Sequence, residues 1–173
     1  MAKSRVFVDT NVIIESFRTK CWLAICEHYA VETVEKCIEE AMTGDRSHPR
    51  YVPVDPRTLR AGPAESHRVA ALDIAALALG CPQSLGLDAG EMELLAYLRR
   101  VGISPEVTIM LSTTDKAAIV VAGLLEWLDR LVSLESLANR SGVARSSVDG
   151  LARHYRTLWL GEIKTKIRLG IMP

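Results

Sequence analysis

The residues of this chain whose types and spacing could do chemistry are acidic side chains at the ends of apolar segments. The first is Asp9, which interrupts the apolar run 5–14. An unpaired carboxylate is expensive to bury in such a run, so a partner must hold it. The other candidates follow or open apolar segments, or lie near the end of a helical stretch, and they are Glu39, Glu40, Asp88, Glu91 and Asp115.

Carboxylates gathered in one place repel each other, and a divalent cation is the usual remedy. Mg²⁺ suits such a site, because it keeps several waters and takes only a few protein carboxylates together with phosphate oxygens. The sequence has no histidine or cysteine cluster that would favour a softer metal. The acids therefore predict a site for a hard cation with oxygen ligands.

Each acid also has a structural explanation. Asp88 and Glu91 are three residues apart at the start of a helical stretch, which fits a capping box. Asp115 at a helix start would be favoured by the helix dipole without any catalysis. Asp9 could cap the helix that follows it by accepting backbone N–H bonds. The combination of these acids is more specific than any one of them.

Short apolar strands that alternate with helices predict an α/β fold with a parallel sheet and right-handed crossovers. Strands are expected at 6–8, 29–32, 107–111 and 131–134, and helices at 19–29, 33–43, 64–79, 88–101 and 115–129. Thr33 is expected to cap its helix, Gly44 to end it, and the proline-rich stretch 44–63 to form a long loop. Ligands bind such sheets at the carboxyl ends of the strands, where Asp9 lies.

The length of 173 residues and the apolar content of 49% are enough for one domain with a small appendage. Four cysteines without CxxC spacing, and no N-terminal signal segment, predict reduced thiols in a cytoplasmic protein. The longest charge-free apolar stretch, 117–125, is too short for a membrane span. Helices 64–79 and 117–128 carry more aliphatic surface than one sheet face covers, which favours a homodimer.

The charge is unevenly distributed. Residues 139–173 contain seven basic and two acidic side chains, whereas the chain as a whole has a net charge of zero. This pattern fits a protein that holds a cation in one place and touches a polyanion elsewhere. The alternative is that the basic segment is a solvated face.

Three segments resemble motifs of the PIN-domain nucleases. VDTNVII (8–14) is similar to that family's opening strand and first acid, LDAGE (87–91) to the Gly-Glu form of its central acid, and STTD (112–115) to its late acid. The resemblance covers about residues 4–134 and implies a three-layer sandwich with a central parallel sheet flanked by helices. It also implies Mg²⁺- or Mn²⁺-dependent cleavage of RNA and, because many members are toxins of toxin-antitoxin pairs, an antitoxin protein as partner. Residues 1–136 would form the nuclease domain and 137–173 a basic helical extension.

Carried over to this chain, the resemblance implies that Asp9, Glu91 and Asp115 hold the metal ion. Glu40 would hold the same ion or a second one partly through water. Glu40 is preferred because the family's acid tends to lie four residues before a glycine, and Gly44 follows here. The adjacent Glu39 stays open as the alternative second acid.

The expected reaction is hydrolysis by metal-activated water, in which hydroxide attacks the phosphate without a side-chain nucleophile. Side chains expected to support the ligating carboxylates or a bound phosphate are Thr10, Asn11, Thr113 and Asp88. Candidate contacts to nucleic-acid phosphates are Arg18, Lys20, Arg46 and Arg50.

The segment 137–148 supports a different class of function, because it looks like a helix-turn-helix. The chain would then be a DNA-binding regulator that uses residues 133–155, with Arg145, Ser146 and Ser147 in the major groove. Against this interpretation, Gly150 would lie inside the recognition helix at a cost of about 1 kcal/mol. A third interpretation is an acidic scaffold that binds a partner without metal.

Overall fold

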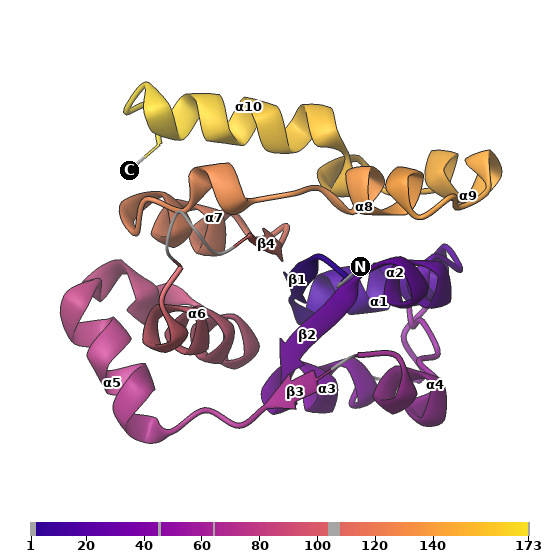
Figure 1. Ribbon diagram of the computed structural model, residues 1–173, viewed down its shortest axis with the longest axis horizontal. Helices are drawn as coiled ribbons and strands as arrows, with labels where there is room; N and C mark the ends of the chain where they lie inside the picture. The colour runs from indigo at the N-terminus through magenta and orange to yellow at the C-terminus, as the bar shows by residue number, and fades with distance from the viewer. Residues whose placement is uncertain (1–2, 45, 64, 104–107, 173) are drawn as a thin grey trace.

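The computed structural model describes residues 3–44, 46–63, 65–103 and 108–172. Four parallel strands form a sheet in the order β3-β2-β1-β4 (Figure 1). The strands are β1 (Arg5–Val8), β2 (Ala30–Val34), β3 (Glu65–His67) and β4 (Ile109–Ser112). In the register, Phe7 lies beside Glu32 on one side and beside Leu111 on the other. The predicted α/β fold with a central parallel sheet and flanking helices is confirmed.

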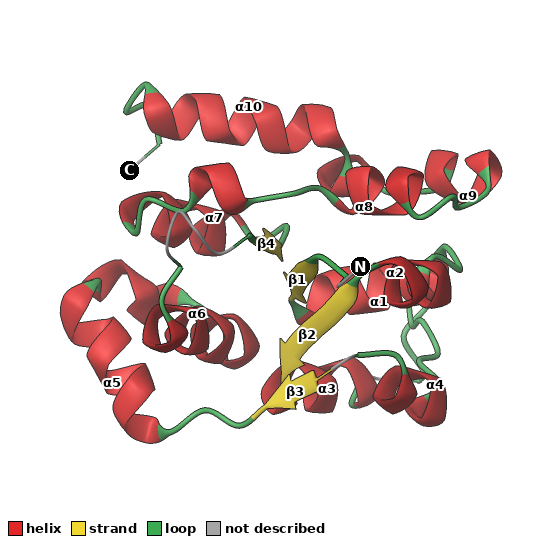
Figure 2. Ribbon diagram, viewed as in Figure 1, coloured by secondary structure: helices red, strands yellow, loops and turns green. Residues whose placement is uncertain are grey.

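Helices connect the strands and cover the sheet from both sides (Figure 2). They are α1 (Thr10–Arg18), α2 (Trp22–His28), α3 (Glu35–Met42), α4 (Pro56–Ala61), α5 (Ala71–Gly80), α6 (Ala89–Val101), α7 (Lys116–Leu124), α8 (Leu134–Arg140), α9 (Arg145–Asp149) and α10 (Thr157–Arg168). No helix of the described residues combines the length and apolar character that crossing a bilayer requires.

The order in which the strands are added to the sheet reverses beside β1, because β2 and β3 are added on one side of β1 and β4 is added on the other. Helices α1 to α4 follow β1 and β2 and lie on one side of the sheet, whereas α5 and α6 lie on the other side (Figure 1). The neighbouring strands β1 and β4 therefore send their following helices, α1 and α7, in different directions. The carboxyl ends of these two strands form the topological switch point, which is where open α/β sheets bind ligands.

The core centres on β1, whose residues Val6, Phe7 and Val8 are fully buried. Such a continuous apolar run is typical of a parallel strand covered on both faces. The same buried cluster continues into the C-terminal helices, where its members include Leu137, Leu151, Leu160 and Ile163. Helix α8 packs against α2, and α10 packs against α7.

The region after Asp9 differs from the prediction. The sequence predicts a single helix at 19–29, but the chain forms α1 immediately after Asp9 and then the shorter α2. Val12 and Ile13 are β-branched, which disfavours a helix locally. Their complete burial and the cap that Asp9 provides outweigh this preference.

The prediction that Thr33 caps a helix is wrong. Thr33 lies in β2, and its hydroxyl donates a hydrogen bond of 2.7 Å to the backbone oxygen of Val8. Helix α3 begins only after Val34, without a side-chain cap. The Thr33 side chain therefore joins two neighbouring strands instead of starting a helix.

Three further segments differ from the prediction. The predicted loop 44–63 contains α4, which is capped by Asp55, and the three-residue β3 follows it. The predicted helix 64–79 begins only at Ala71, and the predicted strand 131–134 forms just one bridge, between Leu131 and Leu111. Residues 45, 64 and 107, which the predictions for these segments and for β4 include, lie outside the described residues.

The predicted helix-turn-helix segment forms α8 and α9, with Ala138 and Val148 buried between them and the body. However, α9 has only five residues, and Gly150 ends it instead of lying inside it. A recognition helix of that length presents little more than one turn to a groove. This geometry does not favour the DNA-binding interpretation.

Candidate active site

Asp9 lies at the end of β1 and is completely buried. It caps α1, because its Oδ1 accepts a hydrogen bond of 2.8 Å from the backbone N–H of Val12. Its Oδ2 is buried and has no hydrogen-bond partner among the described residues. Burial raises the pKa of Asp9 to about 6, although the Thr113 side chain and the backbone of Thr114 hold part of this rise down. The structural explanation thus accounts for one oxygen of Asp9 and leaves the other unsatisfied.

Glu91 lies at the start of α6 and is also buried. Asp88 and Glu91 form the predicted capping box, and the backbone N–H of Asp88 donates to Glu91 Oε2 at 3.4 Å. Burial, together with the negative charges of Asp115 and Asp9, raises the pKa of Glu91 to about 8. Glu91 is therefore close enough to both aspartates for their charges to oppose its ionisation.

Asp115 begins α7, and its Oδ1 accepts a hydrogen bond of 2.8 Å from the backbone N–H of Ala118. Its own backbone N–H donates to the Thr113 hydroxyl at 3.3 Å. Thr113 thus lies between the two aspartates, since it also interacts with Asp9. The hydroxyl of Ser112, one residue earlier, is buried without a partner among the described residues.

Glu40 and Glu39 point in different directions. Glu40 accepts a hydrogen bond of 2.6 Å from the Thr10 hydroxyl and one of 3.0 Å from the backbone N–H of Gly90. Glu39 is exposed and pairs with Lys36 at 3.2 Å. Gly90 permits the close approach, because a Cβ at this position would lie only 2.5 Å from Glu40 Oε2. Glu40 therefore faces the start of α6, and Glu39 faces solvent.

The side chains expected to support the acids have different environments. Thr10 and Thr113 contact Glu40 and Asp9, respectively. Asp88 is exposed and supports Glu91 through the capping box. Asn11 is exposed. Its backbone oxygen accepts a hydrogen bond from the Tyr155 hydroxyl, and the structure shows no contact of its side chain with one of the acids among the described residues.

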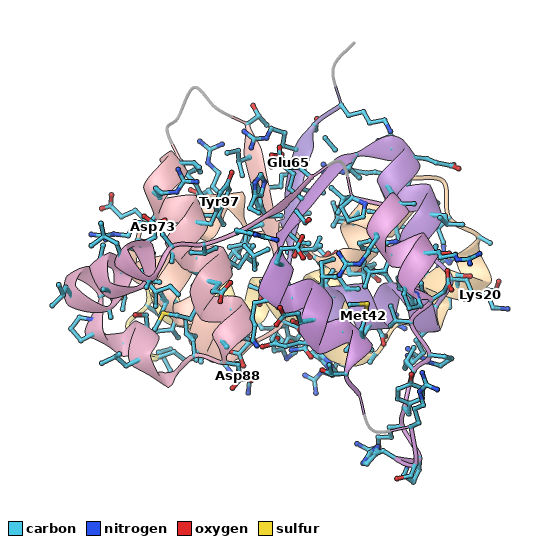
Figure 3. The ribbon with its side chains drawn as sticks, turned by 90° about the horizontal axis from the view of Figure 1, so that it is seen from below. Lys20, Met42, Glu65, Asp73, Asp88 and Tyr97 are labelled. Atoms are coloured by element: carbon cyan, nitrogen blue, oxygen red, sulfur yellow. The ribbon has the colours of Figure 1, made fainter. Side chains whose placement is uncertain are left out.

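The basic residues expected to contact phosphates also differ in their surroundings. Arg18 donates two hydrogen bonds of 2.6 Å to Glu15 and one of 2.7 Å to the backbone oxygen of Gly150, so it has a structural role. Lys20 is exposed, as are Arg46 and Arg50 in the loop after α3. This loop projects from the body on the same side as Asp88 (Figure 3).

Taken together, the acids at the switch point come from four separate segments of the chain.

No protein-family model, curated protein or solved structure matches this chain.

A second group of ligand-type side chains consists of Glu32, Glu65 and His67, whose ligand atoms all lie within 4.8 Å of one another. This spacing could hold a metal ion, and the acids at the switch point do not form so tight a group among the described residues. This group is separate from the switch-point acids, and in Figure 3 Glu65 lies toward the top of the view and Asp88 toward the bottom.

The oxygens of Glu32 already have partners. Arg5 donates to Oε1 at 2.5 Å and to Oε2 at 3.0 Å, and His67 Nε2 lies 2.7 Å from Oε2. The ring of His67 stacks on Tyr97 with centroids 4.1 Å apart. Because a guanidinium occupies the carboxylate, we interpret this group as a hydrogen-bonded network around the Arg5–Glu32 ion pair that joins β1, β2 and β3.

Sequence reasoning missed this second group. Glu32 is a charged residue inside a short apolar strand, and Glu65 and His67 have the spacing of two that places side chains on one side of a strand. The signal was present locally, but the pairing of β2 with β3 was needed to bring the three residues together.

The pH dependence of the melting temperature should reveal the cost of burying the switch-point acids and the repulsion between their charges. Because the pKa values of Asp9 and Glu91 are raised to about 6 and about 8 in the folded chain, the stability that protonation provides is present at low pH and is lost as the pH rises through those values. The melting temperature in EDTA should fall by about 5–10 °C between pH 5 and pH 8. Mg²⁺ or Mn²⁺ should restore more of it at pH 8 than at pH 5.

Thermal unfolding followed by circular dichroism with and without the cation tests this expectation. The pKa values of Glu15 and Glu32 are lowered despite burial, by hydrogen bonds with Arg18 and Arg5, so their contributions are lost only below pH 4.5, outside the measured window. A melting temperature that is level from pH 5 to pH 8 would show that the acids do not destabilise the metal-free chain.

Proposed function

We propose that this chain is a divalent-metal-dependent ribonuclease whose active site is the group of acids at the switch point of the sheet. The observation that carries the proposal is the unsatisfied Oδ2 of the completely buried Asp9. Buried carboxylate oxygens normally have a partner, and a cation would supply one to an oxygen that has none. The raised pKa of Glu91, to which the charges of Asp9 and Asp115 contribute, supports the same conclusion.

Asp9, Glu91 and Asp115 would hold the cation, and Glu40 would support it from α3. A bound Mg²⁺ or Mn²⁺ supplies a water of lowered pKa and neutralises charge on the scissile phosphate. The Thr10 hydroxyl and the Gly90 N–H fix the Glu40 carboxylate before any ligand binds. Thr113 has the corresponding role between Asp9 and Asp115.

The side chains near the acids do not offer an alternative nucleophile of the cysteine type. Cys37 is close to Asp9 and Glu40, since both charges act on it. It is completely buried, and burial raises its pKa to about 12. A thiol of this kind is not ionised at neutral pH and does not attack a phosphate. Water is therefore the proposed nucleophile.

RNA as the substrate and an antitoxin protein as partner follow from the resemblance to the PIN-domain nucleases, and we include both in the proposal. A homodimer is also part of it. Helix α5 is rich in apolar residues and leaves Leu72 and Leu79 about four-fifths exposed, and a second copy of the chain could cover these side chains.

A matched pair of variants tests the role of the second acid. Glu40→Gln should lower the rate of Mn²⁺-dependent cleavage of a single-stranded RNA by about tenfold or more, because the carboxylate that faces the site loses its charge. Glu39→Gln should leave the rate within about twofold, because Glu39 is exposed and pairs with Lys36.

Cleavage is measured on full-length protein with a fluorescent RNA, in EDTA and over a range of Mn²⁺ concentrations. The proposal requires that the wild type cleaves only with the cation. Cleavage that persists in EDTA would refute a metal-dependent mechanism, and a larger loss in Glu39→Gln than in Glu40→Gln would refute the assignment of the second acid.

A further inference from the structure

The C-terminal segment is bound to the first helix by three hydrogen bonds. The Tyr155 hydroxyl donates to the backbone oxygen of Asn11 at 3.1 Å, and the backbone N–H of Ala152 donates to Glu15 Oε1 at 2.8 Å. The third bond is donated by Arg18 to Gly150, at 2.7 Å. Between 132 and 144 residues separate the partners along the chain. This contact is therefore a long-range one, made by the helix that directly follows Asp9.

Glu15 shows that the contact is built into the helix. Its side chain is 7% exposed, and Arg18 neutralises it through two hydrogen bonds of 2.6 Å. The charge of a buried carboxylate needs such partners, because leaving it unpaired would be strongly destabilising. Glu15 also accepts a hydrogen bond from the backbone N–H of Ala152, which lies three residues before Tyr155. Glu15 thus fixes the position of the turn that presents Tyr155.

Tyr155 lies between the two segments that carry the aspartates. Its hydroxyl donates to the backbone oxygen of Asn11, two residues after Asp9, and the Thr114 side chain, one residue before Asp115, lies close enough to offset part of the rise that burial produces in the pKa of Tyr155. The tyrosine is buried, with 7% of its surface exposed. Burial and the charge of Asp9 raise the pKa of Tyr155, so its hydroxyl stays protonated and remains a donor at neutral pH.

We infer that Tyr155 is a positioning residue of the acidic site, which joins the β1–α1 junction to the β4–α7 junction and so sets the separation of Asp9 and Asp115. The inference rests on the proposed metal-dependent function and extends the site to a residue of the C-terminal segment. Two carboxylates must lie at a defined separation to share one small cation, because Mg²⁺ demands near-ideal geometry. Tyr155 acts through these aspartates and does not itself bind the cation.

The test compares two tyrosine variants of the full-length chain. Tyr155→Phe removes only the hydroxyl that joins the two junctions. Tyr29→Phe removes the same atom from a tyrosine that is also buried. Tyr29 lies immediately before β2, at the amino ends of the strands, whereas the acids lie at their carboxyl ends. Titration calorimetry with Mn²⁺ should give a dissociation constant about tenfold weaker for Tyr155→Phe, and an unchanged one for Tyr29→Phe.

The activity of the same variants separates positioning from a general structural role. In Tyr155→Phe the Mn²⁺ concentration for half-maximal RNA cleavage should rise by the same factor, while the rate at saturating Mn²⁺ should be largely recovered. Thr114→Val, which removes the hydroxyl that lies near Tyr155 at the other junction, should shift the Mn²⁺ dissociation constant in the same direction. This second variant keeps the test valid if Tyr155→Phe folds poorly.

The outcomes distinguish this inference from the proposed function. If the wild type binds Mn²⁺ but Tyr155→Phe and Thr114→Val bind it equally well, the positioning role is wrong and the metal site stands. If the wild type itself does not bind Mn²⁺, the proposed function is wrong and the role of Tyr155 in it is wrong too.

Discussion

Asp9→Asn is expected to abolish Mn²⁺-dependent RNA cleavage, lowering the rate by about 100-fold or more, while the variant unfolds in EDTA at pH 8 at the same temperature as the wild type or at a higher one. The amide keeps an oxygen to accept the N–H of Val12, so the cap of α1 survives. It removes a buried negative charge that opposes the ionisation of Glu91. Loss of activity with a gain of stability is the pattern of a ligand held in an unfavourable environment for a functional reason.

Asp55→Asn is the matched control. Asp55 caps α4 as Asp9 caps α1, with its Oδ2 accepting from the backbone N–H of Thr58 at 2.7 Å, but it is exposed. Its replacement should leave cleavage unchanged. RNA cleavage by Asp9→Asn at the wild-type rate, in buffer with saturating Mn²⁺, would mean that the catalytic site is elsewhere.

A chain that ends at residue 136 is expected to lose cooperative folding. The removed segment contributes Leu137, Leu151, Leu160 and Ile163 to the core that surrounds β1. Burial of each such side chain stabilises the fold by about 1.5–3 kcal/mol. Since domains of this size are stable by only about 5–15 kcal/mol, their combined loss removes most of the free energy of unfolding.

Thermal unfolding followed by near-UV circular dichroism measures this effect, and the control is a chain that ends at Arg168, whose missing residues include the exposed Leu169 and Ile171. The control should unfold cooperatively near the wild-type temperature. The division into a nuclease domain at 1–136 and an extension at 137–173 stays a prediction. It would be supported if the shorter chain folded cooperatively and cleaved RNA.

Elements with strong local signals could be predicted from the sequence. The capping box of Asp88 and Glu91 and the glycine at 102, whose φ of 74° suits the end of a helix, define both ends of α6. The buried run of β1 was equally clear. These signals depend on residues that are adjacent along the chain, so no knowledge of the fold was needed to find them.

Elements decided by distant contacts could not be predicted. The β-branched residues Val12 and Ile13 conceal α1 because their burial, not their local preference, makes them helical. Thr33 has the composition of a cap, yet its partner is the Val8 oxygen in the neighbouring strand. Strand β3 is three residues long and lies at the edge of the sheet, where no apolar period can reveal it.

The candidate site shows the same division. That Asp9 and Asp115 lie at the same edge of the sheet follows from the alternation of strands and helices, since Asp9 directly follows β1 and Asp115 follows the neighbouring parallel strand β4 by three residues. The contact of Glu40 with Gly90 depends on the packing of α3 against α6. Tyr155 carries no local signal, because its role depends on Thr114 and Asn11, which precede it by more than 40 and more than 140 residues. The catalytic roles of these residues stay predictions.

The position of β1 in the sheet also determines when the acidic site can form during synthesis on the ribosome. β1 is made first but lies between β2 and β4, so its second neighbour emerges about a hundred residues later. Until then, one edge of the most apolar strand lacks its partner, a state that folds slowly and exposes the nascent chain to aggregation. Because Asp115 and then Tyr155 emerge last among the residues of the site, the acidic site is incomplete until the final helices have been translated.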